Sequence, residues 1–156
     1  MRLFESWRLR ELEFKNRVAV SPMCQYSAKD GHVGHWHLVH LGSRAVGGAA
    51  LVMAEATGAQ AIGRISPEDT GIYLDSHVDA WRAIVEFVKS HGAIAGIQLA
   101  HAGRKGSTAA PWKGGKAVAI ADGGWVPVAP SAVPFSPDYP MPKQLSKQRL
   151  SQLRNR

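Results

Sequence analysis

Three short runs of apolar residues stand out in the amino-terminal two thirds of the chain, at residues 18–20, 49–56 and 94–99. Each is nearly free of polar side chains, which is typical of strands buried on both faces of a parallel sheet. Pro22 follows the first run. Because proline has no N–H to extend a central ladder, the first strand must stop there. We therefore expect three buried strands.

Helical spacing separates these runs. Residues 36–46 place their apolar side chains on one helical face and end at Gly47-Gly48. A second helix is predicted to begin at Ser76, with Asp79 in a capping-box-like position, and to end at Gly92. Its apolar stripe consists of Val78, Trp81, Ile84, Val85 and Val88. The order strand, helix, strand, helix, strand predicts an α/β fold with a parallel sheet and right-handed crossovers.

The remaining segments complete one predicted domain, residues 1–156. Residues 1–16 are expected to form a hairpin that turns near Glu11, and residues 17–100 the three strands and two helices. Residues 101–142 form a long excursion, in which 117–120 and 125–129 could pair around Asp122-Gly123-Gly124. Such a loop after a strand is more often a functional lid than a linker. In residues 143–156, Leu145 and Leu150 flank a Ser146 N-cap and indicate the start of a third helix.

The distribution of charge and the cysteine content bear on which partners and which cell compartment are expected. The net charge is +7, but the tail supplies much of it without any acid: Lys143, Lys147, Arg149, Arg154 and Arg156. This uneven distribution argues against a nucleic-acid partner. Cys24 is the single cysteine, which excludes an intrachain disulfide and favours a cytoplasmic location. No apolar run approaches the roughly 18 residues of a membrane span, so no membrane partner is expected.

Polar side chains follow the ends of the first and third predicted strands. Cys24, Gln25 and Tyr26 come just after the first, and Gln98 lies near the end of the third. The carboxyl ends of strands are where α/β folds place ligands. Taken alone, Cys24 also fits a small buried hydrophobe, and Tyr26 fits a packing loop aromatic. Gln98 is expected to be buried, so its amide must find partners, either in a ligand or at neighbouring strand ends.

Four histidines, His32, His35, His37 and His40, are crowded enough to raise the question of a metal. His37 and His40 could share one helical face. No cysteine or nearby carboxylate completes a tetrahedral set, so the sequence favours no metal site.

Five stretches, in this order, resemble the old yellow enzyme family of FMN-dependent ene-reductases, in particular its thermophilic-like branch of bacterial NADPH dehydrogenases and xenobiotic reductases. They are Asn16-Arg17 with Ser-Pro-Met-Cys-Gln-Tyr at 21–26, Glu-Ala-Thr at 55–57, Gly-Arg-Ile at 63–65, Gly-Ile-Gln-Leu-Ala-His-Ala-Gly-Arg-Lys at 96–105 and Val-Ala-Pro-Ser-Ala at 128–132. The family fold is a (β/α)8 barrel of about 250 residues, so the 156 residues here correspond to its amino-terminal part, about three β/α units.

The resemblance implies roles for individual residues. The flavin-contacting positions are Ser21, Pro22, Met23, Cys24, Ala56 and Gln98, with Cys24 also tuning the redox potential of the flavin. Tyr26 matches a substrate-pocket position. The family's substrate-holding histidine pair, proton-donating tyrosine and an arginine near the flavin belong downstream, so the main catalytic residues are absent from this chain. His37 and His40 are not that pair, and His101 and Arg104 receive no separate role.

The reaction implied is a transfer of hydride from NADPH or NADH to FMN, and from FMN to an alkene conjugated to a carbonyl or nitro group. The expected substrate is a small molecule. A truncated or split form of such an enzyme is the first hypothesis. The alternatives are a non-catalytic half-barrel that needs a complementary carboxyl-terminal chain, or an inactive remnant. The expected protein partner is such a complementary half, or a second copy of the chain in a homo-oligomer.

Overall fold

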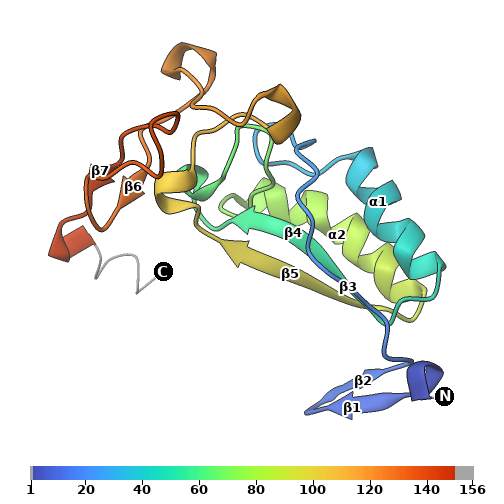
Figure 1. Cartoon of the computed structure of the whole chain (residues 1–156). Helices are drawn as coiled ribbons and strands as arrows, with labels where there is room; N and C mark the ends of the chain where they lie inside the picture. Colours follow the sequence, from blue (N-terminus) through green and yellow to red (C-terminus); the bar gives the residue numbers. More distant parts are fainter. Residues whose placement is uncertain (1, 150–156) are drawn as a thin grey trace.

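A three-stranded parallel sheet in the order β3-β4-β5 forms the centre of the fold. The computed structural model describes residues 2–149 (Figure 1). In it the strands are β3 (Ala19–Val20), β4 (Leu51–Gly58) and β5 (Ile94–Ala100). All three predicted strands are present, although β3 contains only two residues. Because β4 is central, it pairs with a neighbour on both sides, whereas β3 and β5 each pair on one side only.

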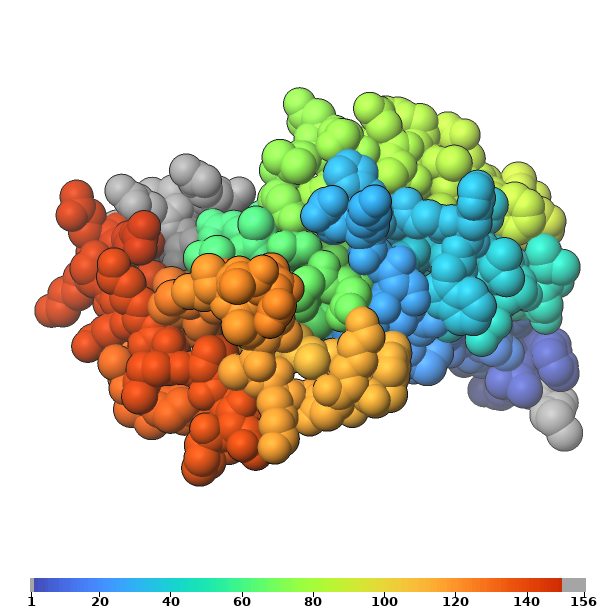
Figure 2. Space-filling view, turned by 90° about the horizontal axis from the view of Figure 1, so that it is seen from above, coloured from blue at the N-terminus to red at the C-terminus, as the bar shows by residue number. Residues whose placement is uncertain are grey.

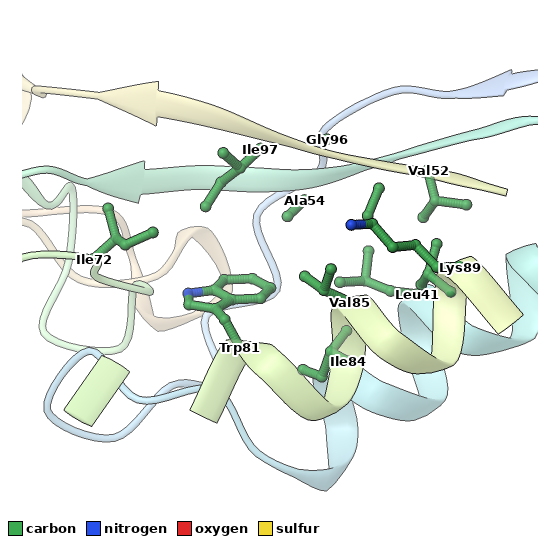
Figure 3. A pocket seen from close by; sticks show the side chains of 12 residues that line it. Leu41, Val52, Ala54, Ile72, Trp81, Ile84, Val85, Lys89, Gly96 and Ile97 are labelled. Carbon is green, nitrogen blue, oxygen red and sulfur yellow. The ribbon is translucent and has the colours of Figure 1, made fainter. Parts of the chain in front are cut away.

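Two helices cover one face of this sheet, α1 (His35–Val46) and α2 (Asp75–Ser90) (Figure 1). Trp81, Ile84 and Val88 of α2 point toward the sheet, where Val52 and Ala54 of β4 meet them. Figure 3 shows most of these side chains around a cavity of about 200 Å³ that separates α2 from β4 and β5. The apolar core therefore lies between the helices and one sheet face, as burial of the helical stripes requires.

Within residues 2–149, no helix lies on the opposite face of the sheet (Figure 1). Met53 and Gly96 are partners on β4 and β5, and both are only half-buried. A Cβ on Gly96 would lie 2.2 Å from the Met53 sulfur, so glycine allows this close approach. Further along, the register shifts between Ala54 and Ala56, which makes Glu55 the extra residue of a β-bulge.

The amino-terminal hairpin lies at the other end of the sheet from the strands' carboxyl ends (Figure 1). Its strands are β1 (Trp7–Leu9) and β2 (Leu12–Phe14), which pair antiparallel, and it follows a short 3-10 turn at Arg2–Phe4. Trp7 and Phe14 stack with their centroids 4.5 Å apart. The Lys15 amine donates to the His91 carbonyl at 2.7 Å and so ties the hairpin to the end of α2.

The excursion beyond β5 is built from short turns and gathers on one side of the molecule (Figure 2, orange to red). The turns are 3-10 segments at Gly103–Lys105, Pro111–Lys113 and Ile120–Asp122, and another, Ala61–Gly63, follows β4. The expected pairing of 117–120 with 125–129 is wrong. Ala117 bridges Thr108, and β6 (Val128–Ala129) pairs in parallel with β7 (Lys143–Gln144). The chain turns at 120–123 with Gly123 at φ 89°, but its two arms find other partners.

Two helix starts differ from expectation. The residue before α2 is Leu74, and the Ser76 hydroxyl lies 3.0 Å from His32 Nε2 instead of capping the helix. In the last segment, residues 143 and 144 are extended as β7. Ser146 does cap a helical turn, because its hydroxyl accepts a hydrogen bond from the Arg149 N–H at 3.2 Å. Leu150 and the rest of the predicted helix lie outside the described residues. Across residues 2–149, no helix is long and apolar enough to span a membrane.

Candidate functional site

Cys24, Ala56 and Gln98 come together at the carboxyl ends of the three strands. Cys24 follows β3 and is half-buried, and its thiol lies close enough to the backbone amide of Ala56 on β4 for that amide to lower the thiol pKa. Ala56 in turn is the register partner of Gln98 on β5. The bulge at Glu55 makes this possible: Ala54 faces the helices, and in a strand of regular alternation Ala56, two positions later, would face them as well.

Ser21, Pro22 and Met23 form the short segment that connects β3 to Cys24. Ser21 and Met23 are exposed, and Pro22 is half-buried. The Met23 carbonyl accepts a hydrogen bond from the Gln25 side-chain amide at 2.8 Å. The segment therefore runs along the same sheet end as Cys24.

Gln98 is exposed, contrary to the burial that its apolar strand suggested. None of the described residues hydrogen-bonds its side chain. The reason is that Gln98 lies on the sheet face without helices, so neighbouring strand ends do not satisfy it. Its amide keeps one donor group and one acceptor free for a ligand.

Tyr26 stands at the edge of this site with a left-handed backbone, φ 48°. Its ring meets Trp112 edge-on, with centroids 5.2 Å apart. It also lines a depression of about 420 Å³ whose other walls come from the excursion, among them Lys116, Asp138 and Tyr139. Burial and neighbouring acidic groups raise the pKa of the Tyr26 hydroxyl, so it is a proton donor at neutral pH.

The surroundings of Cys24 disfavour a thiolate. Burial is the largest cause that raises the thiol pKa to about 11, and the carboxylates of Asp69 and Glu55 add to it. Asp69 is fully buried, and its pKa is raised by that burial. It accepts hydrogen bonds from the backbone N–H groups of Ile65 (2.7 Å) and Ser66 (3.0 Å). At neutral pH Cys24 is therefore an S–H group rather than a reactive nucleophile.

Glu55 and His37 form a buried pair that the sequence did not reveal. Glu55 Oε1 lies 3.2 Å from His37 Nε2, but off the line of a hydrogen bond. His37 Nδ1 accepts a hydrogen bond from the Gly34 N–H at 3.1 Å, which assigns the ring proton to Nε2. An acid at the end of an apolar strand was the only signal, because its partner comes from a separate helix.

The remaining polar candidates lie farther out. His101 is exposed, its Nδ1 accepts from the Gly103 N–H at 3.1 Å, and partial burial lowers its pKa. Arg104 packs over the Phe135 ring with its guanidinium carbon 5.8 Å from the centroid. Within residues 2–149, no three His, Cys, Asp or Glu side chains are placed to hold a metal ion. Two of the four crowded histidines instead have separate partners: His37 faces Glu55, and the His32 ring contacts the His77 ring.

Taken together, the strand ends present a small residue, an S–H group and a free primary amide on a surface open to solvent. A flat ligand with alternating carbonyl and N–H groups on one edge fits these three features. The amide can donate and accept along that edge, and the Ala56 side chain is small enough for close approach.

Comparisons with known proteins agree with one another. The model of the NADH:flavin oxidoreductase / NADH oxidase family matches residues 2–154. An NADPH dehydrogenase of a Geobacillus species is 45% identical over 147 residues, which cover 93% of this chain and 39% of that protein. An NADH:flavin oxidoreductase of Gibberella zeae is 42% identical over 158 residues, covering 99% of this chain and 38% of that protein. The chain thus spans about two fifths of these relatives.

Solved structures of related flavin enzymes are similar to this chain over nearly its whole length. Morphinone reductase superposes with a TM-score of 0.79 at 25% identity, and the match covers 97% of this chain and 41% of that one. The old yellow enzyme homologue from Zymomonas mobilis superposes with a TM-score of 0.77 at 26% identity, covering 99% and 42% of the two chains. The described fold therefore corresponds to part of the barrel of those proteins.

Proposed function

The chain belongs to the NADH:flavin oxidoreductase / NADH oxidase family, and from that premise we propose that it forms one side of the FMN site of an NAD(P)H-dependent ene-reductase. The convergence of Cys24, Ala56 and Gln98 at one sheet end carries this proposal. In this assignment, about three β/α units of the barrel contribute Ser21, Pro22, Met23, Cys24, Ala56 and Gln98.

Each group has a defined task toward the cofactor. The Gln98 amide, which has no partner among the described residues, would bond to the alternating polar edge of the ring. The protonated Cys24 thiol would approach the ring as a weak donor. Ala56 would let the ring lie close to β4. The bound FMN supplies the hydride chemistry, and the protein orients the reactants.

We propose activated alkenes, such as unsaturated carbonyl or nitro compounds, as substrates. Tyr26 stands beside the site and lines the depression under the excursion, which suits a substrate-contacting role. The reaction also needs groups that hold the substrate oxygen and the flavin phosphate. In barrels of this kind, phosphate sites are typically built by loops after the seventh and eighth strands. We assign these tasks to a carboxyl-terminal portion of the barrel, on the same polypeptide or on a second one.

The free edge of β5 supports this need for a further portion. Within residues 2–149, β5 pairs only with β4, so its outer backbone groups have no strand beside them. Leu99 on the helix-facing side is 65% exposed, although a residue of its size is normally covered. A second candidate function follows from the same observation: a non-catalytic half-barrel that pairs with a complementary chain.

The test titrates the protein with FMN, alone and together with the carboxyl-terminal portion of a relative, and follows quenching of flavin fluorescence. NADPH oxidation in the presence of 2-cyclohexenone then reports turnover. Stoichiometric FMN binding with alkene reduction in the assembled barrel supports the proposal. Failure of the assembled barrel to bind FMN overturns it. Co-elution with that portion in size-exclusion chromatography, without turnover, would favour the non-catalytic half-barrel.

A further inference from the structure

The carboxylate of Glu55 holds the turn that follows Cys24. Glu55 is the extra residue of the bulge in β4, and its side chain is only 3% exposed. Its Oε2 accepts a hydrogen bond from the backbone N–H of Gln25 at 2.8 Å. Its Oε1 faces His37 Nε2 at 3.2 Å. Both carboxylate oxygens therefore meet protein groups away from solvent.

The same turn is held from two further directions. The backbone amide of Ala56 lies beside the Cys24 thiol and lowers its pKa, so consecutive residues of β4 face consecutive residues of the turn. The Trp36 indole N–H donates to the Gln25 side-chain oxygen at 3.0 Å. Trp36 and His37 are neighbours at the start of α1. Trp36 at the start of α1 therefore binds the Gln25 side chain, while Glu55 in the bulge of β4 binds its backbone.

We infer that Glu55 is a positioning residue of the candidate flavin site: from the bulge of β4 it fixes the backbone of Gln25 and so determines where the Cys24 thiol stands beside Ala56. The significance of that position rests on the proposed function. The geometry itself does not, because every contact lies within this chain. Glu55 acts through Gln25 and His37 and needs no contact with cofactor or substrate.

The charge of Glu55 gives this role a second, measurable effect. The titratable groups that face the thiol are the carboxylates of Asp69 and Glu55, with the Tyr26 hydroxyl nearby. A negative charge close to a thiol opposes formation of the thiolate. Replacement of Glu55 by glutamine keeps an acceptor for the Gln25 N–H but removes the charge. Replacement by alanine removes both, so the two variants separate the hydrogen bond from the charge.

The first measurement is hydrogen exchange at the Gln25 amide, followed by NMR without flavin. Glu55→Ala should accelerate exchange about tenfold, the loss expected for one hydrogen bond to a charged acceptor. Glu55→Gln should stay much closer to the unsubstituted protein. Glu86→Gln on the exposed side of α2 is the matched control and should change nothing. Unchanged exchange in a folded Glu55→Ala variant would refute the inference.

The second measurement is alkylation of Cys24, the single thiol, by iodoacetamide between neutral and alkaline pH. The rate in the unsubstituted protein should rise only toward a midpoint near 11. The Glu55→Gln profile should shift to lower pH, with several-fold faster alkylation at a fixed pH below the midpoint. A Glu55→Gln profile that overlaps the Glu86→Gln profile would defeat the inference, even where Glu55→Ala fails to fold. Neither readout depends on FMN, so failure of the proposed function remains a separate result.

Discussion

Gln98 on β5 lies directly opposite Ala56 on β4. The pair unites two residues that are far apart in the sequence, and Cys24 joins them through the amide of Ala56. In a parallel sheet, register partners point to the same face. Gln98 therefore presents its amide beside the smallest side chain of the site, on the face that carries no helix.

We expect Gln98→Ala to weaken FMN binding at least tenfold in the FMN-binding form of the protein, because a bond to the ring edge is lost. Its melting temperature should hardly change, since Gln98 is exposed and hydrogen-bonds none of the described residues. Leu99→Ala is the matched control, because Leu99 is exposed on the other sheet face. Fluorescence titration with FMN measures the difference. Equal losses in both variants would contradict a direct role for Gln98.

Gly96→Ala should destabilise the fold by about 1 kcal/mol, the low end of the cost of overpacking, because the flexible Met53 side chain can move aside. The added Cβ would lie 2.2 Å from the Met53 sulfur, so that side chain must move. In a Met53→Ala background the same change should cost clearly less, because the obstacle is gone. Urea unfolding of the four proteins in this cycle gives the coupling. Strict additivity would show that the two residues do not meet.

The cavity between α2 and the sheet offers room for a larger side chain. Ala54 is buried and lines the cavity in Figure 3. Ala54→Val should therefore raise stability by about 0.5–1 kcal/mol, through cavity filling on a strand that suits valine. Ala45, also buried but on α1 away from the cavity, is the control, and Ala45→Val should destabilise. Thermal denaturation checks both, and a loss of stability in Ala54→Val would contradict the cavity's role.

Stability should fall as the pH drops below about 6.5, in part because of His77. Burial lowers the pKa of this imidazole from its ordinary value of 6.5. The unfolded chain then binds the proton more readily than the folded one, so stability is retained above pH 6.5 and lost below it. Its Nε2 donates to the Asp30 carbonyl at 3.1 Å, and its Nδ1 is buried without a hydrogen-bond partner.

His77→Gln should flatten this acid slope, since glutamine can donate to the same carbonyl but cannot titrate. His40 and His101 also have pKa values that partial burial lowers, so the slope should shrink rather than vanish. Exposed His35 provides the comparison, and His35→Gln should keep the full slope. Unfolding free energies between pH 5 and 7.5, at intervals of about half a unit, decide the matter. An undiminished slope in His77→Gln would exclude His77 as a source.

The sequence predicted the elements far better than their contacts. Long apolar runs and helical stripes located β4, β5, α1 and α2 closely, because burial of these faces dominates local preference. The pairing of β6 with β7 escaped prediction because each strand has only two residues and too short a pattern to name its partner. Ser76 looked like a cap, but a nearby imidazole provides its contact.

For the candidate site, too, the sequence predicted the placement of residues at strand ends but not their side-chain contacts. The approach of Cys24 to Ala56 follows from strand order, since both residues come at carboxyl ends. The network of Glu55 with His37 and Gln25 could not be foreseen, because it depends on a helix start meeting a bulge. The exposure of Gln98 was missed for a related reason: an apolar strand indicates burial but does not say what covers each face.

The single additional residue in the middle strand also restricts how this segment can change in length. Inserting one residue directly after Ala56 would turn Thr57 and the later side chains of β4 to the opposite face. Thr57, fully buried and 2.9 Å from the Thr70 hydroxyl, would then be forced outward. Deleting Glu55 would leave these faces unchanged, because Ala54 and Ala56 already pair with consecutive residues of β5, but it would remove the carboxylate that accepts a hydrogen bond from the Gln25 N–H.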